Sequence, residues 1–401
     1  MFIHFVKGWD LKKLLKKISL FRILNAFIKS RIVKYKYNRL GRLYSKKSYF
    51  NNLKVVFDDI WVESVKSKLK PIVYFIGTDE SQDKGGLIPD LEELVDLVTF
   101  YKNDGRYGQY SGLRHYNGIQ GRVLNTLKVI NDIEYLISCG RKPDFILMQA
   151  WGRSFEIEKL IAFKNKHQLR FINISLDDRL VFVDKTPKNE KYNYGISGLI
   201  QLTDLFLVSN PEVVNWYHTE GSNALYFPMA SSLKFFKPLT TQKKFDVGFI
   251  GNCYGYRSEL INYLIRNGIS VQAYGNGWNN GYLDSSKANS FFNECKVVLG
   301  IGTVGHCRNF FTQKLRDFDV PLSGSVYVTN NNIDLIDLYP NGGIVLADTK
   351  HDFLRKIKCL LSDSNMRAVI SRKAYTTAKN SHTYNLRFIK LFEELGIQLT
   401  E

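Results

Sequence analysis

Phe249-Ile250-Gly251-Asn252-Cys253-Tyr254-Gly255-Tyr256-Arg257 is the stretch of sequence that decides the fold. It predicts a strand that ends in a glycine, a short loop, and a helix that opens at about Tyr256. A glycine lets backbone amides come close to a phosphate, and the amino terminus of a helix favours its negative charge. Arg257, in the first turn, could add a charged hydrogen bond. The alternative is an ordinary turn between strand and helix that uses glycine for its geometry.

The next predicted strand ends in a second glycine-rich block, Tyr274-Gly275-Asn276-Gly277-Trp278. Glycines beside Tyr and Trp at the carboxyl end of a strand suit a flat ring, such as a nucleobase, bound in a pocket. The alternative is a Gly/Asn turn with aromatic side chains packed beneath it. The residues alone do not separate these two interpretations.

A third block, Gln313-Lys314-Leu315-Arg316-Asp317-Phe318-Asp319, leads into the small-residue turn Ser323-Gly324-Ser325. Lys314 and Arg316 could neutralise a diphosphate, and Asp319 could accept hydrogen bonds from ribose hydroxyls. The alternative is a solvated helix face with a buried carboxylate cap. Residues 317–319 also have the form of a metal-binding DxD sequence, but their place before a late strand favours the ribose contact.

Around these blocks, short β-rich runs alternate with helical patterns, which indicates parallel sheets covered by helices. The first set of strands is expected at 72–76, 145–149, 170–175, 205–208 and 224–227, with helices around 119–138, 154–166 and 211–219. The second set of strands is expected at 247–250, 270–274, 297–301, 326–329 and 344–346, with helices at 256–267, 286–294, 331–338, 350–361, 364–378 and 384–395. The segment 237–244 lacks apolar periodicity and predicts a linker between two α/β domains. Two such domains in succession form a cleft, where ligands usually bind.

The basic charge of the chain is concentrated at one end. The chain has 401 residues and a formal net charge of +18, and its first fifty residues hold fourteen Lys and Arg against one acid, Asp10. Residues 10–32 predict a helix whose first turns carry apolar side chains on one face and lysines on the other. Such a helix can lie in an anionic membrane interface, or it can dock on its own protein with the lysines exposed.

The amino terminus predicts neither a leader nor a membrane span. Residues 1–17 lack the uninterrupted apolar core and the small-residue cleavage site of a secretory signal. No stretch approaches the roughly 20 apolar residues that cross a bilayer. The five cysteines show no metal-ligand spacing, which fits reduced thiols. We therefore expect the chain in the cytoplasm, either free or lying on the inner face of the cytoplasmic membrane.

Taken together, the blocks of residues 243–395 resemble the glycosyltransferase domain of spore-maturation CgeB-like proteins and related group 1-type transferases. The resemblance rests on GNCYGYR, YGNGW, NECKVVLGI, RDFDVPLSGSVYVT, LLSDSNMRAVISRKA and the closing His382-Thr383-Tyr384 with Arg387. It implies the GT-B fold, in which two Rossmann-like domains face a central cleft and the second domain holds most of the nucleotide sugar. Asp319 stands where the family usually has Glu, and Phe311 stands where retaining relatives often carry a second Glu, so the stereochemical outcome stays open.

The amino-terminal half is similar to the family more loosely, through 174–178, 212–217 and 226–228. An inverting enzyme of this fold would place a base for the acceptor hydroxyl in the first domain, facing the cleft. Asp178, Asp177 and Asp79 follow predicted strands and are the candidates for that catalytic base. The alternative for each is a helix cap or a surface turn. No metal and no cofactor are expected.

The sequence therefore predicts an α/β glycosyltransferase of the GT-B class. Its parts are a basic amphipathic helical segment (1–50), an acceptor domain (51–240) and a nucleotide-sugar-binding domain (241–401) whose last helix can pack back on the acceptor domain. The expected substrates are a nucleoside-diphosphate sugar and a glycan or lipid-linked acceptor, as in bacterial cell-surface polysaccharide synthesis, with an anionic membrane as a further partner of residues 1–50. The residues expected to bind the donor are Gly251, Asn252, Tyr256, Arg257, Tyr274, Gly275, Trp278, Lys314, Arg316, Asp319, Ser323 and Gly324.

Two other functions are compatible with parts of the sequence. A catalytically degenerate scaffold or coat protein would explain the loose first half and the Asp at 319. Nucleic-acid binding would explain the net charge, but no nucleic-acid fold signature is present and much of the charge flanks an apolar helix, so we expect no nucleic-acid partner.

Overall fold

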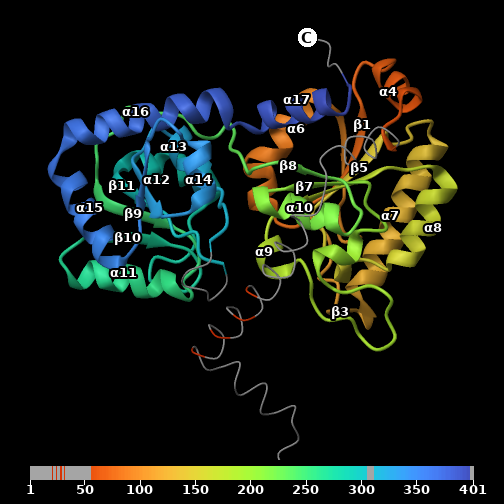
Figure 1. Cartoon of the computed structure of the whole chain (residues 1–401), viewed down its shortest axis with the longest axis horizontal. Coiled ribbons are helices and arrows are strands. Elements are labelled where there is room, and N and C mark those ends of the chain that lie inside the picture. Colours follow the sequence, from red (N-terminus) through yellow and green to blue (C-terminus); the bar gives the residue numbers. More distant parts are fainter. Residues whose placement is uncertain are drawn as a thin grey trace, which may run out of the picture. The chain divides into compact units, whose positions relative to one another are not determined.

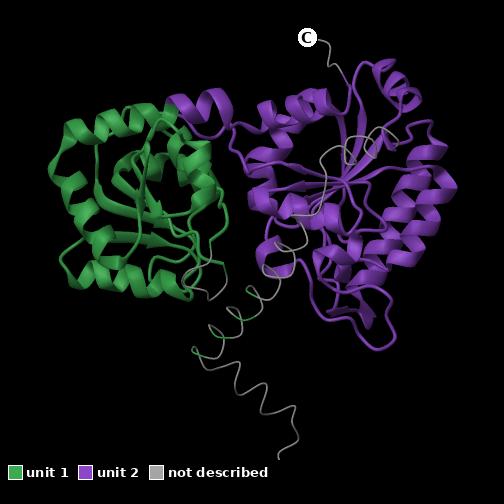
Figure 2. Cartoon of the chain, viewed as in Figure 1, with its two compact units in different colours: residues 1–35, 238–375 green, residues 36–237, 376–401 purple. Residues whose placement is uncertain are grey.

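The computed structural model of the chain describes residues 56–304 and 311–397, together with Leu20, Leu24, Ile28 and Arg31. The helix predicted at 10–32 lies outside the described residues apart from these four, which are helical and exposed. Two compact units are present, one made of residues 1–35 and 238–375 and the other of residues 36–237 and 376–401 (Figure 2). The chain thus passes between the units twice, at Lys237–Pro238 and again inside a long helix at Tyr375–Thr376.

The amino-terminal unit is built on a six-stranded sheet in the order β2-β1-β5-β6-β7-β8, and every neighbouring pair is parallel (Figure 1). Four of these strands are short and almost wholly buried, and their residues are apolar except for Asn173 and Ser175 in β6, as expected for a sheet covered on both faces. The strands are β1 (Ile72–Ile76), β2 (Asp96–Thr99), β5 (Phe145–Met148), β6 (Phe171–Ser175), β7 (Leu205–Val208) and β8 (Ala224–Tyr226), with a separate hairpin of β3 (His115–Tyr116) and β4 (Ile119–Gln120).

Helices connect these parallel strands, because a parallel pair needs a crossover segment. They are α4 (Asp59–Lys66), α5 (Glu80–Gln82), the π-helical turn η1 (Asp83–Leu87), α6 (Ile88–Leu94), α7 (Gly121–Ser138), η2 (Gly152–Ser154), α8 (Ile157–His167), α9 (Asp178–Val181), η3 (Ile196–Leu199) and α10 (Pro211–Thr219). The helices α7 and α8 pack against each other.

The last helix, α17 (Tyr384–Glu394), packs on α6 of the amino-terminal unit. The buried carboxylate of Asp90 in α6 binds both α17 and the segment that follows β8. It accepts hydrogen bonds from the Ser232 hydroxyl at 2.5 Å and from the Asn385 amide, in the first turn of α17, at 3.1 Å. A carboxylate at the amino terminus of a helix also interacts favourably with the helix dipole. The returning helix is therefore an integral part of this unit.

The carboxy-terminal unit has a five-stranded parallel sheet in the order β10-β9-β11-β12-β13. Its strands are β9 (Phe245–Ile250), β10 (Val271–Tyr274), β11 (Cys295–Leu299), β12 (Tyr327–Asn330) and β13 (Ile344–Ala347). The next strand along the chain, β10, lies on one side of β9, and β11 lies on the other side. The strand order therefore reverses between β9 and β11. In doubly wound sheets, ligands bind beyond the carboxyl ends of the strands at this point.

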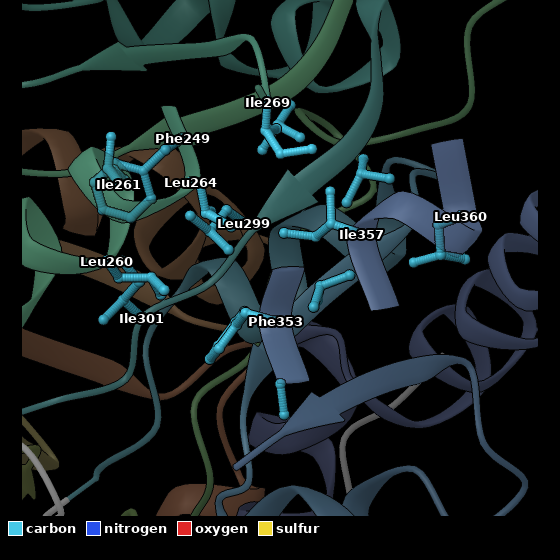
Figure 3. Packing of buried hydrophobic residues seen from close by; sticks show 14 of the residues in the cluster. Phe249, Leu260, Ile261, Leu264, Ile269, Leu299, Ile301, Phe353, Ile357 and Leu360 are labelled. Carbon is cyan, nitrogen blue, oxygen red and sulfur yellow. The ribbon is translucent and has the colours of Figure 1, made fainter. Parts of the chain in front are cut away.

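The core of this unit lies between the sheet and two of its helices, α11 and α15. Figure 3 shows how side chains from α11, α15 and the strands meet there, among them Leu260 and Phe353 with Phe249 and Leu299. Two further helices, α12 and α13, contact β9, β11 and β12. The helices of the unit are α11 (Tyr256–Arg266), η4 (Ser285–Lys287), α12 (Ala288–Glu294), α13 (Arg316–Leu322), α14 (Ile333–Leu338), α15 (Lys350–Ser362) and α16 (Ser364–Ser381).

The predicted fold class is confirmed: both sheets are parallel and helices alternate with their strands. The structure adds elements that the sequence did not predict, chiefly β2 and α13. It also revises the predicted linker at 237–244. Beyond the unit boundary the chain is bound to α12, because Leu239 N donates to Asn293 Oδ1 and Lys243 Nζ donates to Asn293 O. Within the described residues, no helix has the length and apolar character needed to cross a bilayer.

Candidate functional site

Arg316 occupies the point at which the strand order of the carboxy-terminal sheet reverses. It is the first residue of α13, and its guanidinium group reaches the ends of the two strands that flank the reversal. Nη1 donates to the carbonyl of Ile250, the last residue of β9, at 2.7 Å, and Nη2 donates to the carbonyl of Ile301, just beyond β11, at 3.3 Å. The sheet therefore holds a fixed positive charge where ligands of this architecture bind.

Arg257 brings a second guanidinium group to the same place from the first turn of α11. A Cβ built on Gly251 would lie 2.9 Å from Arg316 Nη1 and 3.4 Å from Arg257 Nη1, so both groups reach this glycine. Gly251 has a φ of 152°, which also favours glycine. Arg257 donates to the Asn252 carbonyl at 3.2 Å and stacks on the Tyr254 ring at 4.3 Å from its centroid. The predicted loop 251–257 and the predicted Arg316 thus form one cluster.

The charges of the buried Arg257 and the half-buried Arg316 repel each other. Arg257 is 6% exposed, and burial together with the nearby Arg316 charge lowers its pKa to about 10. Neither guanidinium forms an ion pair with a carboxylate of the described residues, and the Nε atoms of both are buried without a hydrogen-bond partner. Buried charges are normally paired. The cluster is therefore built to receive an anion with several oxygen acceptors, as a diphosphate has.

A buried carboxylate and two tyrosines hold α13 in place behind Arg316. Asp317 is 1% exposed, and its carboxylate accepts from Lys314 N at 2.7 Å and from Tyr327 OH at 2.6 Å. Pro321 has no N–H for the Asp317 carbonyl four residues earlier, and Tyr339 OH donates to that carbonyl at 2.8 Å instead. Sequence reasoning missed these roles, although it did raise a buried carboxylate cap as an alternative for this block.

The predicted ring-binding block, 274–278, packs against Gly251 and stabilises the loop 251–257. Trp278 Nε1 donates to the Gly251 carbonyl at 2.7 Å, and its ring packs edge-on against Phe249 in the core. Gly275, with φ of 133°, has no room for a Cβ, which would lie 2.5 Å from the Gly251 carbonyl oxygen. The Tyr274 ring packs against Phe291. This geometry is that of the alternative raised above, a turn with aromatic side chains packed beneath it.

The remaining predicted donor residues fall into two groups. Asn252, Tyr256, Lys314 and Asp319 lie in the same loops and first turns as the arginines, and the Asn252 side chain accepts from Asn276 N at 3.1 Å. Ser323 and Gly324 lie at the opposite end of α13 from Arg316. Ser323 is buried and donates to Val320 O, and Gly324, with φ of 72°, ends the helix.

The three candidate catalytic carboxylates differ in their surroundings. Asp79 caps α5 by accepting from Ser81 N and Gln82 N, which is the helix-cap alternative. Asp178 is fully buried, its Oδ1 accepts from Tyr217 OH at 2.5 Å, and its Oδ2 has no partner. Burial above all raises the pKa of Asp178 to about 7. Asp177 is half-buried and lies two residues beyond the carboxyl end of β6, whereas Asp79 is exposed.

Within the part of the chain that the structure describes, no group of three or more His, Cys, Asp or Glu side chains has the arrangement of a metal site.

We predict that replacing Arg257 with Met makes the ligand-free chain more stable and insensitive to pyrophosphate. The change removes a buried charge that is repelled by a half-buried one, so the free energy of unfolding should rise by about 1–3 kcal/mol and thermal unfolding should shift upward. Pyrophosphate should raise the unfolding temperature of the wild type and not that of the variant. Arg266→Met, at the exposed end of the same helix, is the matched control and should behave as wild type. A less stable Arg257→Met that still responds to pyrophosphate would contradict this assignment.

We predict a pH-dependent effect of Asp178→Asn on stability. The raised pKa means that the folded chain keeps a proton that the unfolded chain releases between pH 4 and 7. The contribution of Asp178 to the free energy of unfolding is therefore present at low pH and is lost as the pH rises through about 7. Denaturant titrations should find the variant more stable than wild type at pH 8 by a few kcal/mol, with the difference shrinking toward pH 5. The exposed Asp337→Asn is the control, and parallel curves for wild type and Asp178→Asn would refute the prediction.

Residues 257–393 match the family described as glycosyl transferase-like. No curated protein matches the chain. Among solved structures, sucrose-phosphate synthase from Thermosynechococcus elongatus is similar with a TM-score of 0.56 at 12% identity, over 82% of this chain and 99% of that one. Anabaena HepE in complex with UDP-glucose gives 0.56 at 10% identity, over 81% and 99%.

A third similar structure is a DNA-modifying β-glucosyltransferase, solved with and without uridine diphosphoglucose. It has a TM-score of 0.53 at 12% identity and covers 81% of this chain and 100% of that one. Identities this low establish the fold and not the substrates. Residues 257–393 thus resemble the glycosyl transferase-like family, and the chain has the GT-B fold of two Rossmann-like domains.

Proposed function

We propose that the chain transfers a sugar from a nucleoside-diphosphate sugar to a glycan or lipid-linked acceptor in bacterial cell-surface polysaccharide synthesis. The observation that carries the proposal is the pair of a buried Arg257 and a half-buried Arg316. The pair has no carboxylate partner among the described residues and lies where the strand order reverses. Transfer leaves a nucleoside diphosphate, and its developing charge must be stabilised. Two guanidinium groups fixed against backbone carbonyls are suited to that role and would make a metal ion unnecessary.

The donor is proposed to lie along the loops that converge on Gly251. Arg257 and Arg316 hold the diphosphate, with Lys314 beside them, and Asp319 binds the ribose hydroxyls. Trp278 and Tyr274 act mainly by supporting the loop, since their rings pack on Phe249 and Phe291. Anabaena HepE was solved with UDP-glucose, so UDP-glucose is the first donor to test on this chain.

For the acceptor base we favour Asp177 among the three carboxylates. A general base must come within hydrogen-bond reach of the acceptor hydroxyl. Asp178 is fully buried against Tyr217, and Asp79 is engaged in capping a helix, whereas Asp177 is half-buried at a strand end. Asp178 and Asp79 remain candidates in that order.

Sugar transfer is tested by donor binding and turnover on matched variants. Wild type should be stabilised by UDP-glucose or another nucleoside-diphosphate sugar, and should hydrolyse or transfer its sugar. Arg316→Gln should lose both properties, while Asp177→Asn should keep donor binding and lose at least about a hundredfold in turnover. Arg355→Gln, an exposed arginine of α15 paired with Asp352, is the control. Binding without turnover in the wild type would favour the scaffold alternative, and the absence of any stabilising donor would remove the proposal's main support.

The amino-terminal segment is proposed to bring the enzyme to an anionic membrane at the cytoplasmic face. Its first fifty residues carry fourteen basic residues. Leu20, Leu24 and Ile28 recur at the spacing of one helical face and are 75%, 53% and 46% exposed. Exposed apolar side chains at this spacing on a basic segment suit insertion into the interface of an anionic bilayer.

Liposome co-sedimentation tests this attachment. Replacing Leu20, Leu24 and Ile28 with Ser should abolish binding to vesicles that contain phosphatidylglycerol, because the apolar contact is lost while the charge is kept. The matched control replaces Ile60, Leu69 and Ile333, which are 83%, 91% and 71% exposed outside this segment, and should bind as wild type. Undiminished sedimentation of the first variant would rule this attachment out.

A further inference from the structure

Three loops at one edge of the amino-terminal sheet form a continuous platform that the donor site does not use. They comprise residues 101–120 after β2, residues 149–154 after β5, and residues 182–195 after β6 and α9, and we call them the three-loop platform. All three follow the carboxyl ends of parallel strands, the edge at which α/β sheets bind their ligands. Figure 1 labels β3, the first strand of the hairpin in the first of these loops.

The backbones of the three loops pack directly on one another. A Cβ on Gly112 would lie 1.9 Å from the Arg153 carbonyl oxygen, and a Cβ on Gly152 would lie 2.1 Å from that of Asn193. Gly152 N also donates to Gly195 O at 2.8 Å. Only glycine fits at such contacts, which fixes each loop against its neighbour. Side chains on the platform are therefore held in place before any ligand arrives, and less ordering entropy is lost on binding.

The platform carries an excess of positive charge. Its three segments contain seven Lys and Arg residues and three acidic residues. Asp104 is paired with Arg106, and Glu190 is paired with Arg122 from the start of α7. The other cations have no carboxylate within ion-pair distance among the described residues; they are Lys102, Arg114, Arg153, Lys185, Lys188 and Lys191. The platform can thus bind several anionic groups without breaking its own ion pairs.

Aromatic rings lie beside these cations. The guanidinium of Arg153 lies 5.4 Å from the centroid of the Trp151 ring, and Lys185 Nζ lies 5.9 Å from that of Tyr194. Trp151 and Tyr194 are half-buried, so part of each ring is presented to solvent. A ring surface packs on the apolar face of a sugar, while a cation next to it binds a carboxylate or phosphate on the same chain.

We propose that the three-loop platform binds an acidic glycan, a sugar chain bearing carboxylate or phosphate groups, and that this glycan is the acceptor. The inference rests on the proposed function for the choice of a glycan over another polyanion and for its role as acceptor. Carboxylate or phosphate groups of the glycan would bind the cations that have no carboxylate partner, and its sugar rings would pack on Trp151 and Tyr194.

Titration calorimetry on the full chain tests the proposal with defined probes. Oligogalacturonate supplies carboxylates, oligo(glycerol phosphate) supplies phosphates, and a maltooligosaccharide of equal length is neutral. We expect at least one of the acidic oligomers to bind at least tenfold more tightly than the neutral one. Arg153→Gln and Lys185→Gln should each weaken that binding about threefold. Lys142→Gln is the matched control, because it is exposed just before β5, at the opposite edge of the same sheet.

Three outcomes would overturn the proposal: equal affinity for the acidic and neutral oligomers, no effect of Arg153→Gln and Lys185→Gln, or tighter binding of an oligothymidylate of matched charge. UDP-glucose is titrated into the same samples to separate this inference from the proposed function. If UDP-glucose binds and the acidic oligomers do not, only the proposal that the platform binds an acidic glycan is contradicted. Acidic-glycan binding without any nucleotide binding contradicts the donor site and leaves the platform as a glycan-binding surface.

Discussion

Two like charges held close together, one buried and one half-buried, are the constraint on which the carboxy-terminal unit depends. Arg257 and Arg316 come from the first turns of different helices and meet at Gly251, between the ends of β9 and β11. Keeping them there requires a glycine at 251, a Trp278 bond to its carbonyl, and the Asp317–Tyr327 contact behind α13. Such an arrangement costs stability in the free chain and is offset when an anion binds. These loop contacts therefore hold the two arginines at Gly251.

The amino-terminal unit has a different design. Its carboxyl edge is covered by loops that pack through glycine backbones and present cations beside aromatic rings. Its core contains a carboxylate, Asp178, that is buried against Tyr217 and has one oxygen without a partner. One unit thus concentrates charge in a single partly buried cluster suited to a diphosphate, and the other spreads charge over a surface suited to a longer chain. This division agrees with the separate binding of donor and acceptor that the GT-B fold permits.

The sequence predicted the parallel sheets because their strands are short runs of buried apolar residues; the predicted 72–76 and 205–208 coincide with β1 and β7. It missed β2, whose four residues are only half-buried and begin with Asp96. It missed α13 because Pro321 argues against a helix, and the Tyr339 hydroxyl that compensates comes from a later segment. The convergence of Arg257 and Arg316 was expected from the motifs. The packing of Trp278 beneath the turn was raised only as an alternative, and the burial of Asp178 was not expected, because both depend on contacts between residues far apart in the sequence.

The central claim is that the Arg257–Arg316 pair binds the diphosphate of a nucleotide. The most direct measurement is a calorimetric comparison of uridine, UMP and UDP binding to the wild-type chain, repeated at raised salt. Our account predicts that affinity rises from uridine to UMP and again from UMP to UDP. This gain in affinity should shrink as the salt concentration increases. Equal affinities for uridine and UDP would show that the pair does not bind the diphosphate and would contradict the account.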